Sequence, residues 1–318
     1  MLIDNRSEER MSKILNRLSE TSAAYKLSLK DGESTKMKNK YDILMDFLVI
    51  KKLEGCSIET ISGYYTILNK FVDYIHKPYD ELNGENIREY LINYQAKNSI
   101  TNRSLDDIRR CISSFCNYLE DEEIIARNPS RKVHKIKYEK VVKKPFSDIE
   151  LEKMRDNCKT PRERALIDLL SSTGCRVGEI VRMDISDFDM EKREILVYGK
   201  GNKERVVYID ARTKLHIQEY LNTRTDNEKA LFVTSRKPHK RLGKNVIENI
   251  VREIGKEVGI ENAHPHRFRR TLATSLINKG MPIEQVQVIL GHSKLETTTI
   301  YAQVNQESVK MNHSRFTM

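Results

Sequence analysis

The chain has 318 residues and a formal net charge of +10, and its length is typical of two domains. No apolar run approaches the ~18 residues of a membrane span, and the charged N-terminus argues against a signal peptide, so we expect no membrane location. The five cysteines are odd in number and form no Cys-x-x-Cys pair, which argues against a disulfide framework and a zinc ribbon. These features favour a protein of a reducing cytoplasm.

Positive charge is concentrated in two segments. Residues 127–144 contain eight basic residues and one acidic residue, and residues 235–244 contain five basic residues and no acid. Such an excess favours an anionic partner, most often nucleic acid, and two clusters suit a phosphate backbone that is contacted from more than one side. Together with one lysine-bearing turn, these clusters supply the candidate DNA-binding residues Arg131, Lys132, Lys135, Lys137, Lys203, Arg236, Lys237, Lys240, Arg241 and Lys244.

The chain divides into four predicted parts. Residues 1–36 are expected to form an N-terminal extension with one short helix. Residues 37–128 predict an all-helical bundle, because apolar residues recur at helical spacing between short polar connections. The residue before a proline is disfavoured in a helix, so Asn128 and Pro129 are expected to end the bundle. A basic linker over residues 129–145 follows. Residues 146–318 form the second domain.

Capping residues mark several predicted helix ends. Ser57, Ser147 and Thr160 are suited to N-caps, Pro161 to a first helical position and Gly174 to a helix end. One helix, residues 9–20, is expected in the extension. In the bundle we expect a helix that stops at Gly55 and helices over residues 58–76, 83–94 and 101–119. In the second domain we expect helices that start at 148 and at 161, followed by helices over residues 246–258, 265–279, 282–290, 295–304 and 305–312.

Strands are expected only within the second domain. Residues 193–199 and 204–210 are β-branched and aromatic runs on either side of a Gly-Lys-Gly-Asn turn, a pattern that predicts a hairpin. Residues 230–234 predict a third strand. The fold class is therefore mainly α with a small β-sheet (α+β).

Six side chains of the second domain form a set suited to phosphoryl transfer. Alone, each is typical of a helix cap, a turn or a packed surface; together they offer phosphate clamps, proton carriers and a nucleophile. Neither a P-loop nor a carboxylate cluster at ligand spacing is present, which disfavours ATP and two-metal hydrolysis, so no cofactor and no metal is expected. The set consists of Arg176, Lys200, His266, Arg269, His292 and Tyr301.

With these residues in place, the sequence resembles the tyrosine recombinases, most closely in pattern the phage-integrase and Xer group. The resemblance extends over roughly residues 38–318 and rests on four motifs in family order. These are TGCRVGEI, VYGKGNKERVVYI, HPHRFRRTLATSLINKG and VQVILGHSKLETTTIYAQV. The family's usual histidine after the second arginine is replaced here by Arg270.

The resemblance implies a role for each residue of the set. Tyr301 would attack the scissile phosphate and give a 3′-phosphotyrosyl bond and a free 5′-hydroxyl. The arginines would hold the phosphate, Lys200 would protonate the leaving hydroxyl, His266 would assist proton transfer and His292 would hydrogen-bond the phosphate. Glu179, one helical turn after Arg176, is a candidate supporting residue behind it.

The resemblance also implies partners. The bundle would be the SAM-like core-binding domain, which clamps double-stranded DNA carrying paired recombinase sites together with the catalytic domain. Exchange of C-terminal tails would join a homotetramer on that DNA, in a cytoplasmic, nucleoid-associated protein.

The biological role remains open at this point. The N-terminal extension favours the integrase of a mobile element over an Xer-type chromosome or plasmid dimer resolvase. A type IB topoisomerase shares the nucleophile chemistry, and a non-catalytic DNA-binding regulator on the same scaffold is the alternative from another class. The regulator would have no need of Tyr301.

Overall fold

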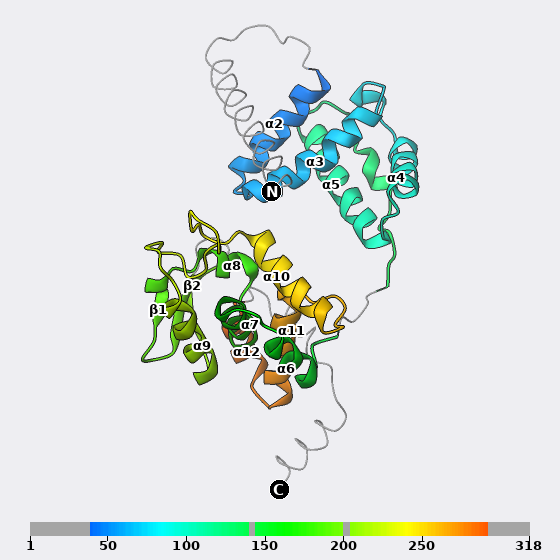
Figure 1. Cartoon of the computed structure of the whole chain (residues 1–318). Helices are drawn as coiled ribbons and strands as arrows, with labels where there is room; N and C mark the ends of the chain where they lie inside the picture. The colour runs from blue at the N-terminus through cyan, green and yellow to red at the C-terminus, as the bar shows by residue number, and fades with distance from the viewer. Residues whose placement is uncertain (1–38, 140–143, 200–203, 292–318) are drawn as a thin grey trace. The chain divides into compact units, whose positions relative to one another are not determined.

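The computed structural model describes residues 39–139, 144–199 and 204–291 (Figure 1). The chain forms two compact units, and the boundary between them lies between Val141 and Val142. The predicted helices over residues 9–20, 295–304 and 305–312 lie outside the described residues. Within the described part of the chain, no helix is long and apolar enough to cross a membrane.

The N-terminal unit is helical where it is described. The four helices expected in the bundle are confirmed, with ends that differ from the prediction by a few residues. The elements are α2 (Lys40–Leu53), α3 (Ile58–Tyr74), the 3-10 turn η1 (Tyr79–Glu81), α4 (Gly84–Asn98), α5 (Asn102–Asp121) and the 3-10 turn η2 (Pro129–Lys132).

Caps and an aromatic core explain why these helices form. The Ser57 hydroxyl accepts a hydrogen bond from the backbone N–H of Thr60, as the sequence predicts for the start of α3. Phe47, Phe71 and Phe115 are fully buried between the helices. The rings of Phe47 and Phe115 meet edge to face, with centroids 5.3 Å apart, a favourable arrangement for aromatic pairs.

The first half of the predicted linker packs against this unit. Val133 is buried, and the backbone N–H of Ile136 donates to the buried carboxylate of Asp106 at 3.0 Å. The side chain of Arg88 donates to the carbonyl of Lys132 at 3.2 Å. The segment up to residue 137 is therefore held along α4 and α5, which gives its lysines a fixed backbone.

The C-terminal unit combines helices with a small antiparallel sheet. Its elements are α6 (Asp148–Asp156), α7 (Pro161–Thr173), α8 (Val177–Arg182), the 3-10 turn η3 (Ile185–Asp187), β1 (Phe188–Asp189), β2 (Glu194–Tyr198), β3 (Glu204–Tyr208), α9 (Ala211–Asn222), α10 (Lys244–Glu257), α11 (Pro265–Asn278) and α12 (Ile283–Leu290). The expected caps are confirmed: Ser147 precedes α6, Thr160 and Pro161 start α7, and Gly174 ends it in the left-handed region.

The sheet has the order β1-β2-β3, and the predicted third strand is wrong. The strands β2 and β3 pair antiparallel with Ile195 opposite Val207, which confirms the hairpin. Residues 230–234 instead form isolated bridges and hydrogen bonds to loops: the N–H of Leu231 donates to the carbonyl of Met183, and that of Leu242 to the carbonyl of Phe232. This run is apolar because it is buried in the core, not because it belongs to a ladder.

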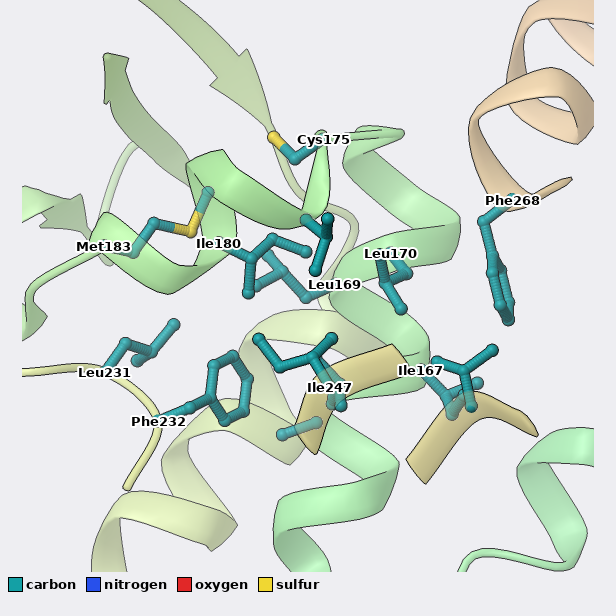
Figure 2. Close-up of a cluster of buried hydrophobic side chains, with 14 of the residues drawn as sticks. Ile167, Leu169, Leu170, Cys175, Ile180, Met183, Leu231, Phe232, Ile247 and Phe268 are labelled. Carbon is teal, nitrogen blue, oxygen red and sulfur yellow. The ribbon is translucent and has the colours of Figure 1, made fainter. Parts of the chain in front are cut away.

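One core holds the helices of this unit in place (Figure 2). Side chains of α7, α8, α10 and α11 gather in it, among them Leu169, Ile180, Ile247 and Phe268. All four are at most 1% exposed. Burial of these apolar side chains holds the starts of α8 and α11, where Arg176, His266 and Arg269 lie.

Candidate active site

Arg176 occupies the N-cap of α8, immediately after the turn that ends α7. Gly174 has φ +58°, and a Cβ there would come within 3.0 Å of Leu272 and 3.2 Å of Leu290, so both the turn and the close packing require glycine. Glu179, three residues after Arg176, accepts the Arg176 backbone N–H at 2.8 Å and its Nη1 at 2.9 Å. These bonds fix both the backbone and the guanidinium of Arg176.

The Glu179 carboxylate is a buried charge. Burial by itself raises its pKa, but hydrogen bonds and positive charge from Arg205, and then from Arg176, outweigh burial and lower the pKa to about 2. Glu179 is therefore ionised at neutral pH. Glu179 is thus in direct contact with Arg176, and its supporting role stays a prediction.

Arg269 reaches the same place from α11. Its side chain is buried, and its guanidinium donates to the carbonyl of Gly174, at 2.9 Å, and to that of Leu290. The Arg176 Nη2 donates to the next carbonyl, that of Gly291, at 3.1 Å. Two arginines 93 residues apart in the sequence thus meet at the C-terminal end of α12, where carbonyl groups carry partial negative charge.

His266 lies one turn before Arg269, in the first turn of α11. Desolvation by the surrounding protein lowers its pKa, and the charges of Arg269 and Arg176 lower it further. The residue keeps a solvent-exposed surface, which limits this effect. A neutral imidazole beside two guanidinium groups is suited to accept a proton.

The other arginines of the same motif contact residues near the start of this unit. The Arg267 guanidinium stacks 4.1 Å from the ring centre of Phe146 and pairs with Glu150 at 3.0 Å. Arg270 donates to the carbonyl of Lys144 at 3.1 Å. Of the three arginines in the motif, Arg269 alone has a described contact with the end of α12.

Arg205 of β3 is a site residue that the sequence interpretation missed. Its Nη1 and Nη2 each donate to a different oxygen of Glu179, both at 2.8 Å. A signal was present: in the alternation of β3, Arg205 lies on the same face as the buried Val207 and opposite the exposed Glu204 and Val206. A charged residue on the inward face of a strand needs a charged partner.

The candidate DNA-binding residues differ in their surroundings. Those with exposed side chains are Arg131, Lys132, Lys135, Lys137, Arg236, Lys237, Lys240 and Lys244. Arg131 also pairs with Glu120 at 2.6 Å, an exposed pair of small energetic value. Arg241 is partly buried, pairs with Asp184, and donates to the carbonyls of Val181 and Met183. The positive charge of Arg241 is therefore paired within the protein.

The remaining candidates lie outside the described residues. These are Lys200, Lys203, His292 and Tyr301. Among the described residues, no group of His, Cys, Asp and Glu side chains could hold a metal ion.

Comparisons with known proteins identify the family of the chain. The sequence model of the phage integrase family matches residues 145–308, and that of the N-terminal SAM-like domain of phage integrases matches residues 43–126. Tyrosine recombinase XerA of Pyrococcus horikoshii is 31% identical over 273 residues, which cover 85% of this chain and 91% of the relative.

Solved structures share the fold. XerH site-specific recombinase bound to its palindromic difH substrate matches with a TM-score of 0.68 at 20% identity, over 97% of both chains. A lambda integrase dimer bound to a COC′ core site matches with a TM-score of 0.69 at 18% identity, over 82% of this chain and 94% of that one. The chain therefore belongs to the phage integrase family and is a tyrosine recombinase.

Proposed function

We propose that this tyrosine recombinase cuts and rejoins double-stranded DNA at paired sites through a covalent bond between Tyr301 and a DNA 3′-phosphate. The observation that carries the proposal is the meeting of Arg176 and Arg269 at the end of α12, whose C-cap Gly291 directly precedes His292. Two guanidinium groups with a neighbouring imidazole can bind a phosphodiester and stabilise the charge of its transition state.

The proposed cleavage step needs no reactant besides the protein and the DNA. The Tyr301 oxygen attacks phosphorus, the bond from phosphorus to the 5′-oxygen breaks, and Lys200 protonates that leaving oxygen. His266 accepts the phenol proton, and Arg176, Arg269 and His292 hold the non-bridging oxygens. Rejoining reverses these transfers with a 5′-hydroxyl from the partner site.

DNA is the proposed partner of both units. The exposed lysines held along α4 and α5, and the exposed basic residues before α10, would contact the phosphate backbone. The related XerH and lambda integrase structures were solved as complexes with DNA sites, which supports this assignment. Four protomers would assemble on two sites by exchange of the residues after Tyr301, in the cytoplasm and at the nucleoid.

The biological role proposed is integration of a mobile element. The match of residues 145–308 to the phage integrase family is compatible with this role. An Xer-type dimer resolvase is the second candidate, because the XerA relative is 31% identical over most of this chain.

A suicide substrate tests the chemistry. Half-site duplexes selected by the protein from a random DNA pool would carry a nick beside the scissile phosphate, so that cleavage releases a short strand and traps the adduct. We expect a covalent band with the wild-type protein, in excess EDTA and without ATP, because arginine and lysine supply the charge stabilisation. Tyr301→Phe should bind the duplex with nearly unchanged affinity and form no adduct.

Three outcomes would contradict the proposal. A covalent band that survives Tyr301→Phe would exclude Tyr301 as the nucleophile. No adduct with any selected duplex would favour a non-catalytic regulator. Relaxation of supercoiled DNA without exchange between sites would favour a type IB topoisomerase.

A further inference from the structure

Glu179 is shared between two arginines, and the sharing determines the charge of the site. Arg176 and Arg205 both donate to its carboxylate, whose side chain is 3% exposed. Both arginines and the carboxylate together carry a net charge of +1. Without Arg205, the Glu179 charge would offset that of Arg176 alone, and the pair would present no net charge to a phosphate.

Arg205 also contacts the end of α12. Its Nε donates to the carbonyl of Ile289 at 3.2 Å. A Cβ at Gly291 would lie 2.9 Å from Arg205 Cδ and 3.0 Å from its Nε and Nη1, so the arginine side chain lies directly against this glycine. Gly291 has φ +64° and precedes His292.

One guanidinium therefore joins three segments. They are β3, which begins four residues after Lys200 in the sequence, the start of α8 with Arg176, and the end of α12. The arginine fork suits this task, because its five N–H donors lie in one plane and can serve a carboxylate and a carbonyl at once.

We propose that Arg205 is a positioning residue of the recombinase site, which engages Glu179 so that Arg176 keeps its positive charge for the phosphate and which fixes the end of α12. The inference rests on the proposed function, since it assigns Arg176 to the scissile phosphate. Arg205 itself acts through Arg176 and the α12 end, not on the DNA.

The first test compares single-turnover rates of adduct formation on the nicked half-site duplex. Arg205→Gln should slow the reaction on the order of 10- to 100-fold, as is usual when a residue that orients a functional group is lost. Its half-site Kd should rise only about fivefold, because many other phosphate contacts contribute to binding. Arg205→Lys keeps the charge but loses the two parallel hydrogen bonds, so its rate should lie between wild type and Arg205→Gln.

The double variant Arg205→Gln/Glu179→Gln separates charge from structure. A neutral side chain at position 179 no longer offsets Arg176, so the double variant should react at least about fivefold faster than Arg205→Gln alone. A purely structural role predicts that the second substitution leaves the rate unchanged or lowers it. That outcome would overturn the inference.

Arg155→Gln is the matched control. Arg155 makes an ion pair with the buried Asp168 at 2.7 Å and is 17% exposed, against 12% for Arg205, and its described ion pairs do not include Glu179. This control should lower the melting temperature as much as Arg205→Gln does, with a rate within about twofold of wild type. An equal loss of rate in the control would show that general destabilisation explains both.

A binding measurement keeps the inference testable even without catalysis. In the Tyr301→Phe background, the half-site duplex is compared with one that carries a neutral methylphosphonate at the scissile position. The protein should prefer the charged phosphate, Arg205→Gln should reduce that preference at least about fivefold, and the double variant should restore part of it. An unchanged preference in Arg205→Gln refutes the inference, whereas missing adducts with a changed preference refute only the proposed chemistry.

Discussion

The ionisation of Glu179 predicts a specific pH dependence of stability. Its pKa falls from an ordinary 4.5 to about 2 in the folded protein, although burial opposes this change, because Arg205 and Arg176 bind the carboxylate. The difference corresponds to about 3 kcal/mol of folding free energy at pH 7. Since the pKa is lower in the folded chain, this stabilisation is complete above about pH 5 and is lost as the pH falls towards 2. At pH 3 about 1 kcal/mol of it remains.

Urea unfolding of wild type and Glu179→Gln at pH 7 and pH 3 measures this effect. Glutamine is nearly isosteric with protonated glutamate, so the two proteins should differ by about 3 kcal/mol at pH 7 and by much less at pH 3. Glu257→Gln, which removes an exposed pair with Lys159, is the control and should change the midpoint far less. An equal difference between wild type and Glu179→Gln at both pH values would refute the argument that the arginines keep Glu179 ionised.

Three further predictions concern the proposed acid, the C-terminal tail and the turn before α8. Lys200→Ala should slow cleavage of a normal phosphodiester linkage by on the order of 10²- to 10⁴-fold. It should slow cleavage of a linkage with a 5′-bridging sulfur far less, because the sulfur leaves without a proton. Equal losses of rate on both substrates would exclude Lys200 as the acid. Truncation after Asn305 should spare half-site binding but weaken cooperative binding and abolish strand exchange, and normal recombination by the truncated protein would argue against tail exchange. Gly174→Ala should destabilise the fold by about 1–2 kcal/mol in thermal melts, because φ is +58° and Leu272 lies close, whereas Gly178→Ala, with no atom within 4 Å of its Cβ, should not destabilise it.

Local signals in the sequence determined most of the helical architecture. Ser57, Ser147 and Thr160 each cap the helix predicted for them, and Gly174 ends α7 as expected. These interactions involve residues within one turn of each other, so they can be recognised without knowledge of the fold. The same holds for the β2–β3 hairpin, whose two strands are recognisable from their runs of β-branched and aromatic residues.

At one place, a run that is apolar because it is buried in the core was predicted to be a strand. Residues 230–233 are apolar, as a buried strand would be, yet their backbone groups bond to the loops around Met183 and Leu242. The hydrophobic pattern of a sequence indicates whether a residue is buried, but not which backbone group it hydrogen-bonds. The partner is set by packing between elements that are distant in the sequence.

The site shows the same limit. The sequence identified Arg176, Arg269 and His266 by motif, but only the packing of α7, α8 and α11 brings both guanidinium groups to the end of α12. Arg205 was not identified because its partner, Glu179, lies 26 residues away on another element. Sequence alone predicted which residues could perform the chemistry. The tertiary structure decided which charges are shared, because a buried ion pair depends on distances that local sequence does not encode.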